Sequence, residues 1–342
     1  MINRNELRIE LLSPTFLGNA EKKGIWRTPP LKALLREWWR IAAAPAAGYR
    51  HQTLRDQEGM LFGQAWLESG ASRSKVRLAL AHWKEGKSQW GHQDQTVKHG
   101  EVKSPVGSQL YLGYGPLIYK RDTGLGLQNN SVLEAGGSNV LKLAWPAEET
   151  IIPQVLQLIH WFGTVGGRSR NGWGSLAFAG QDTLHAEQSA LKAVLRPLID
   201  CLQLDWPHAI GQDKQGALIW ESKKPFADWV AAMRFLAQTK IEYRTMFSFS
   251  TGAGSNRIED RHIIAYPVTH HDVRAWGGQA RLANQLRFKL FRDSQQRLRA
   301  RIYHTPHVCP LPDVRLDQLA VWQKIHGRLD QNPELQRLGG AQ

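Results

Sequence analysis

Cysteine and long apolar runs are both scarce in this 342-residue chain. The two cysteines, Cys201 and Cys309, stand far apart and outside any paired motif. The sequence therefore predicts neither a disulfide framework nor a cysteine zinc site. No uncharged apolar run is long enough to span a bilayer, and Arg4, Glu6 and Arg8 lie where a signal peptide has its apolar core. We expect a soluble, cytoplasmic protein without a membrane partner.

Acidic side chains are the second shortage. The chain has 30 Asp and Glu against 44 Lys and Arg, which gives a formal charge of +14 and an isoelectric point near 9.9. A surplus of this size favours a polyanionic partner. On charge alone, nucleic acid is the first class of partner and an anionic membrane surface the second, and the partner that we expect is nucleic acid and not a membrane.

The usual signatures of enzyme chemistry are also missing. Gly86-Lys87-Ser88 has the form of a P-loop ending, but Ala81 stands where the first glycine belongs. Ser169 is no nucleophile elbow, because Asn171 takes the place of the second glycine. We find no HExxH motif and no acidic cluster of the kind that holds two magnesium ions. The sequence therefore predicts no catalytic residue, no metal and no cofactor.

Histidine keeps one catalytic alternative open. His270-His271-Asp272 and the pair His304 and His307 have the composition of metal ligands, or of a general acid and base for a ribonuclease. Such pairs are more often surface or capping features. A metal-independent endoribonuclease is therefore the second hypothesis.

The order of predicted elements indicates an α+β fold. A strand in 7–18 precedes a helix whose N-cap is Thr28, and strands follow in 75–83 and 138–145. A helix over 151–162 ends at Gly163, and a strand over 175–180 completes a βαββαβ, ferredoxin-like order. We place this first domain at 1–182, with a polar insertion at about 48–107.

The remainder, 183–342, is predicted to form a connecting helix and a second, smaller domain. The connecting helix covers 187–204. The domain's predicted elements are a helix in 226–240, a strand in 262–268, a hairpin in 284–304 that turns near Asp293, and a helix in 314–329. A similar element order in the two halves is consistent with a duplicated fold.

The most unusual stretch is GTVGGRSRNGWGS, residues 163–175, between a predicted helix and a predicted strand. Its five glycines accompany Arg168, Arg170 and Trp173. Free backbone N–H groups, two cations and an aromatic face suit a nucleic-acid contact. The other reading is a connection whose glycines only allow tight turns.

The helix after Pro29 and Pro30 carries a second basic feature. Lys32, Arg36 and Arg40 recur at the spacing of one helix face, with Glu37 as the sole acidic residue nearby. We expect an exposed basic stripe, although a solvated helix face without function has the same appearance.

Four motifs, taken together, resemble the RAMP subunits of type III CRISPR effectors, most of all the first-numbered Cmr subunit at the head of type III-B complexes. They are PTFLGNAEKKGIWRTPPLKALLREWWR, EGMLFGQA, YLGYG and GTVGGRSRNGWGS. The resemblance spans most of 1–180 and is thinner beyond, in RHIIAYPV and RLANQLRFKL. It does not extend to the insertion.

The resemblance implies two RAMP domains of ferredoxin-like (RRM-like) fold and no known catalytic activity. It also implies a place near the 3′ end of the guide RNA, contacts with guide RNA, target single-stranded RNA and other RAMP subunits, and a role in antiviral defence. The alternatives are a RAMP-fold endoribonuclease that processes guide precursors and a subunit that only binds proteins. The RNA-binding candidates are Lys22, Lys23, Arg27, Lys32, Arg36, Trp39, Arg40, Gly166, Gly167, Arg168, Ser169, Arg170, Asn171 and Trp173, with Arg121, Arg257 and Arg261 as weaker additions.

Overall fold

The computed structural model describes residues 1–21, 23–65, 70–128, 131–179, 188–252 and 254–339. The chain forms two compact units, each assembled from several segments. The first unit contains Met1–Gln93, Gly113–Val194 and Lys289–Leu298, and the second contains Asp94–Leu112, Leu195–Phe288 and the chain from Arg299 onward. The predicted domain boundary between residues 182 and 183 lies outside the described residues.

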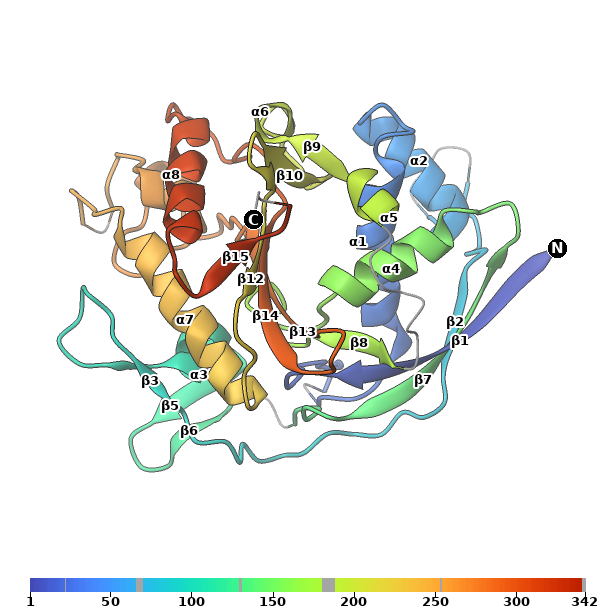
Figure 1. Cartoon of the computed structure of the whole chain (residues 1–342), viewed down its shortest axis with the longest axis horizontal. Coiled ribbons are helices and arrows are strands. Elements are labelled where there is room, and N and C mark those ends of the chain that lie inside the picture. Colours follow the sequence, from blue (N-terminus) through green and yellow to red (C-terminus); the bar gives the residue numbers. More distant parts are fainter. Residues whose placement is uncertain (22, 66–69, 129–130, 180–187, 253, 340–342) are drawn as a thin grey trace. The chain divides into compact units, whose positions relative to one another are not determined.

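The first unit is built on a four-stranded antiparallel sheet with the strand order β2-β7-β1-β8. Helices α1 and α4 lie together on one face of this sheet (Figure 1). The elements are β1 (Ile2–Leu11), α1 (Thr28–Ala43), α2 (His51–Phe62), β2 (Arg77–Leu80), β7 (Ser138–Pro146), α4 (Ile152–Phe162) and β8 (Leu176–Ala179). The strands and helices predicted for the first domain are therefore present in the predicted order, but the first strand spans Ile2–Leu11 where 7–18 was predicted.

Alternation along β1 explains the core of the first unit. Leu7, Ile9 and Leu11 are buried, whereas the residues between them face away from the helices. Trp38 of α1 stacks on Phe162 of α4 with 5.4 Å between ring centroids, which joins the two helices above the sheet. Fully burying one such aromatic side chain contributes roughly 3 kcal/mol.

The start of α1 differs from the prediction in one detail. The N-cap is Arg27, in an extended conformation without a side-chain cap, and Thr28 is already helical. The two prolines then occupy the first turn, where their missing N–H groups have no helical partner to lose. The prediction of Thr28 as N-cap is wrong because prolines already fix the start of this helix.

The predicted insertion contributes to the main sheet as well as to peripheral elements. Strand β2 lies at an edge of the first sheet, and the apolar island EGMLFGQA belongs largely to α2. The smaller strands of this region are β3 (Thr96–Val97) and β4 (Val106–Gly107), and three further elements follow the insertion: α3 (Ser108–Gly113), β5 (Leu117–Lys120) and β6 (Gly124–Leu127). Strands β5 and β6 form a hairpin of the first unit.

A second four-stranded sheet has the order β13-β14-β12-β15 and is accompanied by the helices α7 and α8 (Figure 1). These elements follow the chain as β12 (Ile219–Ser222), α7 (Trp229–Thr245), β13 (Leu286–Arg292), β14 (Leu298–His304), α8 (Gln318–Asp330) and β15 (Leu335–Arg337). All of them belong to the second unit except the last four residues of β13 and the first residue of β14, which belong to the first unit. When the four strands of each sheet are numbered along the chain, both sheets have the strand order second, third, first, fourth. The α+β class is confirmed.

Two predictions in the second half are wrong. The single helix expected over 187–204 is divided into α5 (Gln188–Lys192), β9 (Leu195–Pro197) and α6 (Leu198–Cys201), because Pro197 cannot continue a helix. Strand β9 instead pairs with β10 (Ile210–Asp213), which also pairs with β11 (Gly216–Ala217).

The strand expected in 262–268 is also absent. A 3-10 helix spans Asp260–Ile263, a second one spans Arg274–Trp276, and Ile263 and Ile264 are buried. A short apolar run has the same pattern in a buried helical turn as in a buried strand. In the described parts of the chain, the helices are all too short or too polar to cross a membrane.

Candidate nucleic-acid interface

The glycine-rich loop, residues 163–175, begins at the C-cap of α4 and closes on itself before β8. Gly163 donates to the carbonyl of Ile159 at 2.7 Å, and Thr164 pairs with Ser175. Gly166 and Gly174 adopt φ values of +93° and +66°, the left-handed region that favours glycine. A Cβ at Gly166 would lie 2.7 Å from the carbonyl oxygen of Phe16, so this backbone is too closely packed for a side chain.

Much of that close packing is against the segment that follows β1. Gly167 donates to the carbonyl of Phe16 at 2.9 Å, and the N–H of Gly174 donates to Pro14 at 3.0 Å. The hydroxyl of the buried Ser13 donates to the carbonyl of Gly172 at 2.7 Å. The glycines thus bring two protein backbones together, which agrees with the alternative reading given to them in the sequence.

Arg168 is the part of the loop that faces solvent. It is exposed, and its φ of +56° is uncommon for a residue with a side chain. Its Nε donates to the carbonyl of Tyr114 at 2.6 Å. Ser169 and Arg170 are half-buried, and Asn171 is buried. The predicted cluster of cations therefore presents one exposed arginine, Arg168, whose guanidinium is held in place by its bond to Tyr114.

The tryptophans expected to stack on bases are core residues. Trp173 is fully buried and packs against Phe16 and Trp90, with ring centroids 5.1 and 5.8 Å away. Trp39 is buried with its ring edge toward Phe62. The expectation of a base-stacking face on either indole is wrong, because both rings are buried against other aromatic side chains and have no face open to a base.

The basic stripe of α1 is not an open face. Arg36 Nε lies 2.6 Å from Glu58 Oε1, and Arg40 reaches the same carboxylate at 3.2 Å. Glu58 comes from α2 and is buried, whereas the two arginines keep part of their side chains in solvent. Partial burial, and then the charge of Arg36, lower the pKa of Lys32. The expected lack of an acidic partner is wrong because that partner belongs to another helix.

The loop before α1 holds the remaining candidates. Lys23 is half-exposed and lies 3.7 Å from Glu21 and 4.0 Å from Glu85. Arg27 is half-buried and donates to the carbonyl of Gly18 at 2.5 Å. Lys22 lies outside the described residues. Of the weaker additions, Arg261 is buried and paired with Glu101, while Arg121 and Arg257 are exposed.

Tyr114 is a surface residue that the sequence reading missed. Two-thirds of its side chain is exposed, and its backbone carbonyl receives the bond from Arg168. It lies within the YLGYG motif, directly after α3. The motif was visible, but nothing in the sequence distinguishes its exposed tyrosine from its half-buried one, Tyr111.

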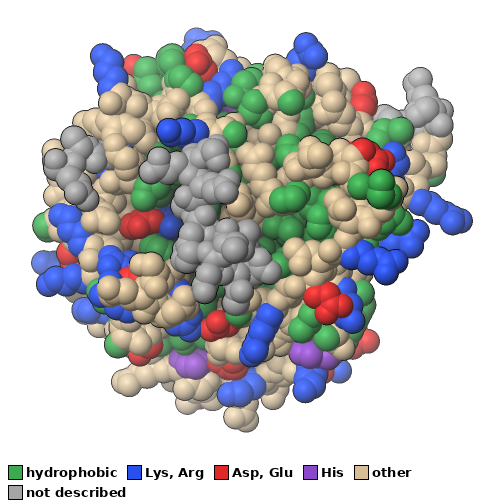
Figure 2. Space-filling model, turned by 45° about the vertical axis from the view of Figure 1, so that its right-hand side comes forward, with side chains coloured by type: hydrophobic (Ala, Val, Ile, Leu, Met, Phe, Trp, Pro, Cys, Tyr) green, Lys and Arg blue, Asp and Glu red, His purple; other side chains and the backbone are tan. Residues whose placement is uncertain are grey.

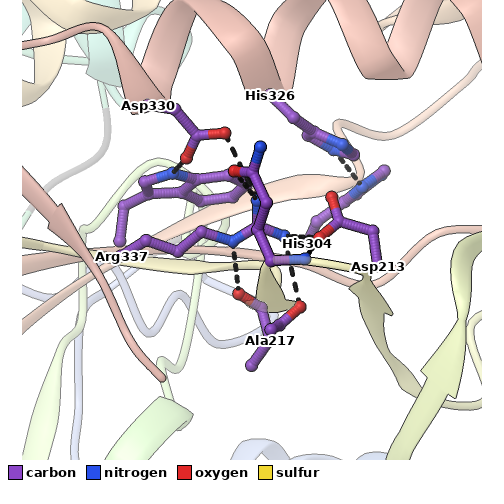
Figure 3. A network of polar contacts seen from close by, with 9 residues as sticks. Asp213, Ala217, His304, His326, Asp330 and Arg337 are labelled. Atoms are coloured by element: carbon purple, nitrogen blue, oxygen red, sulfur yellow. Dashed lines mark hydrogen bonds and ion pairs between the residues drawn. The ribbon is translucent and has the colours of Figure 1, made fainter. Parts of the chain in front are cut away.

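The two histidines of the predicted catalytic pair, His304 and His307, lie in different surroundings. His304 belongs to a buried polar network, and His307 contacts the backbone elsewhere. His304 Nδ1 lies 3.0 Å from His326 Nε2, and both rings are buried. Beside them Arg337 bonds to Asp213 and Asp330 (Figure 3). Burial lowers the pKa of His326 to about 3, with Arg337 adding to the effect, and lowers that of His304 well below its usual value. His304 is therefore a neutral core residue, out of reach of a large substrate.

Two of the other expected histidines, His307 and His271, also have structural contacts, whereas His270 is exposed. His307 is buried with its Nδ1 2.9 Å from the carbonyl of Val308. His271 stacks on Phe249 with 4.0 Å between centroids, and its Nδ1 lies 2.8 Å from the carbonyl of Thr251. Within the described ranges, no three His, Cys, Asp or Glu side chains are grouped as metal ligands.

The positive charge is dispersed on the face drawn in Figure 2. Lys and Arg side chains occur there in small separate groups, with Asp and Glu among them. Affinity for a polyanion on this face would then depend on where one group meets a suitable loop or aromatic side chain.

Comparisons with known proteins give structural neighbours only. No protein-family model matches the sequence, and no curated protein matches it. Cmr1 from Pyrococcus furiosus, in its apo form, is 15% identical with a TM-score of 0.48, over 98% of this chain and 98% of that chain. This chain is similar to Cmr subunits.

Two further neighbours are chains of type III-B Cmr-beta complexes. One complex, bound to cognate target RNA, gives 10% identity and a TM-score of 0.48, over 96% of this chain and 99% of that chain. The other, bound to cognate target RNA and AMPPnP in the presence of single-stranded DNA, gives 11% and 0.45, over 94% and 98%.

Proposed function

We propose that this chain is a non-catalytic, RNA-binding subunit of a type III CRISPR effector complex. In this proposal each unit is a ferredoxin-like RAMP domain. The subunit contacts other RAMP subunits near the 3′ end of the guide RNA and assists capture of target RNA. The four motifs and the charge of +14 support this role. The identical strand order of the two sheets supports the pair of domains.

The observation that carries the RNA-binding role is the exposed Arg168 at the tip of the glycine-rich loop. The loop is anchored through its backbone to the segment after β1, so ordering this arginine costs little entropy on binding. A guanidinium is suited to phosphate because it offers paired donors in a plane. Lys23 and the solvent-facing parts of Arg36 and Arg40 add charge in the same unit. The expected mode is phosphate contact with little sequence preference.

A salt series with labelled single-stranded RNA tests this function on the purified full chain, with and without EDTA. We expect a salt-sensitive shift of intact RNA. For Arg168→Glu we expect weaker binding and a slope of log affinity against log salt that is reduced by about 0.7, the value for one lost phosphate contact on a single strand. Arg315→Glu, an equal charge change at an exposed site of the second unit, is the matched control.

The result separates the three hypotheses. Binding that is absent, or equally weakened by both variants, contradicts a phosphate site at Arg168. Discrete products that form in EDTA favour the histidine ribonuclease instead. Stable association with companion RAMP subunits, without any RNA affinity, favours a protein-only role.

A further inference from the structure

The turn that carries Tyr114 is locked between two parts of the glycine-rich loop. On one side, Gly113 packs so closely on the buried Trp173 that a Cβ would lie 3.2 Å from its ring. On the other side, Gly115 has a φ of +110°, and a Cβ there would lie 3.4 Å from the Arg168 guanidinium. The backbone of Tyr114 is therefore held from both neighbours.

The Tyr114 side chain takes no part in that packing. It is 66% exposed, and the bond from Arg168 uses only its backbone carbonyl. An exposed tyrosine alone is ordinary, since singly scattered aromatic rings are common on protein surfaces. What is unusual here is a solvent-facing ring on a backbone fixed directly beside an exposed cation.

Arg168 retains donors for a ligand. Its Nε bonds to Tyr114, and the structure shows no other bond for it among the described residues. The terminal amino groups can thus meet a phosphate while the Nε–H holds the guanidinium in place. The phosphate and the base of one nucleotide are joined through its ribose, so a cation beside an aromatic ring can contact both groups of the same nucleotide.

We infer that Tyr114 and Arg168 form a site for one unpaired nucleotide of single-stranded RNA, with the base on the Tyr114 ring and a phosphate at the Arg168 guanidinium. The buried Trp173 holds the backbone of this site in place by packing against Gly113, the residue before Tyr114. The stacking is indifferent to base identity, because every base presents a π-face. This inference rests on the proposed RNA-binding function and deepens it.

The test compares two RNA probes against three variants of the full chain by fluorescence anisotropy at fixed salt. The probes are a labelled uridine oligomer and an abasic oligomer of equal length, which keeps the phosphates but has no bases. The variants are Tyr114→Ala, Tyr114→Phe and Tyr119→Ala. Tyr119 is the matched control because it is 65% exposed, lies on β5 of the same unit and has no bond to Arg168.

For Tyr114→Ala we expect about tenfold weaker binding of the uridine oligomer, the scale of one lost stacking contact, and unchanged binding of the abasic oligomer. Tyr114→Phe keeps the ring and should bind like the wild type, as should Tyr119→Ala. Unchanged affinity in Tyr114→Ala overturns the inference, and so does an equal loss on both probes or in the Tyr119 control.

The failure of this site is distinguishable from failure of the proposed function. If the wild type binds RNA and Arg168→Glu weakens it while Tyr114→Ala does not, the RNA-binding role stands and the stacking site is excluded. If the wild type binds neither probe, both are excluded. Circular dichroism of each variant checks that the altered side chain has not unfolded the chain.

Discussion

The two four-stranded sheets share one order of strands, and they differ in two of the connections that join their strands to the helices. In the first unit, 12–27 join β1 to α1 and 163–175 join α4 to β8. In the second, the equivalent connections are 223–228 and 331–334. The order of strands and helices around each sheet is thus repeated, but both of these connections are longer in the first unit than in the second. The comparison teaches that loops of one unit, and not the shared topology, distinguish it as the candidate for RNA contact.

The units also differ in how they satisfy buried polar groups. In the first, the two long connections bond to each other: the side-chain hydroxyl of Ser13 donates to the carbonyl of Gly172, and the N–H of Gly167 donates to the carbonyl of Phe16. In the second, the connection from α8 to β15 is held by Asn332, which accepts hydrogen bonds from the N–H groups of Glu334 and Leu335. Polar side chains also lie in the core there, around the ion pair of Arg337 with Asp213. Every described histidine with a resolved lowering of its pKa belongs to the second unit.

The largest effect is expected from Gly174→Ala, which disrupts the loop that only the first unit has. The residue has a φ of +66°, and a new Cβ would clash with the backbone carbonyl of Val165. Left-handed strain and overpacking together should cost about 4 kcal/mol of unfolding free energy. Denaturant unfolding measures this loss.

Gly136→Ala is the control for strain without crowding. Gly136 also has positive φ, +81°, but open space around it, so we expect a loss of only about 1 kcal/mol. Equal losses in the two variants would show that the close approach at Gly174 does not matter.

A smaller effect should appear on acidification, and in the second unit. Burial, followed by the charge of Arg337, holds the pKa of His326 near 3, with Asp213 acting in the opposite direction. The unfolded chain binds the proton at about pH 6.5, so stability falls as pH falls below that value. The loss is about 2 kcal/mol from this histidine between pH 6.5 and 5. His304 should add a loss of the same sign.

Hydrogen exchange at pH 7 and pH 5, corrected for intrinsic rates, locates this effect. Protection of α8 should fall more than protection of α4. His326→Gln removes the titrating group but keeps a polar partner for His304, and should flatten the dependence. An equal loss in both helices would remove this distinction between the units.

The smallest effect is expected from Glu58→Gln in the first unit. The change removes the carboxylate shared by Arg36 and Arg40, and because both arginines are partly in solvent the cost is about 1 kcal/mol. The loss of one negative charge beside Arg36 and Arg40 should raise RNA affinity by about threefold if this face contacts phosphate. Asp56→Asn, with the same charge change on α2, should leave affinity unaltered. An unchanged affinity in Glu58→Gln argues against RNA contact by α1.

Local patterns predicted the main elements because they act over short distances. The alternation of Leu7, Ile9 and Leu11 marks β1, and Asp293 marks the hairpin turn, where its carboxylate accepts from the N–H groups of Gln295 and Arg297. The prediction failed for Ile263 and Ile264, whose short apolar run is equally compatible with a strand or a buried helical turn. Pro197 was visible in the sequence, and the helix placed across it was wrong.

The candidate site was predictable in part. Arg168 and its glycines stand out by composition, and the structure leaves that arginine exposed. Tyr114, by contrast, lies far from Arg168 along the chain and is joined to it through a single backbone carbonyl. No local pattern reports such a pairing.

The sequence by itself determined the excess of positive charge, the order of strands and helices in the first half of the chain, and the presence of a loop rich in glycine and arginine. These follow from composition and from periodicity, which depend on neighbours along the chain. Only the tertiary structure decided which aromatic rings are buried, that Glu58 neutralises much of the α1 stripe, and that Tyr114 lies beside Arg168. Burial and pairing depend on residues brought together from distant segments, and the sequence alone does not specify those distances.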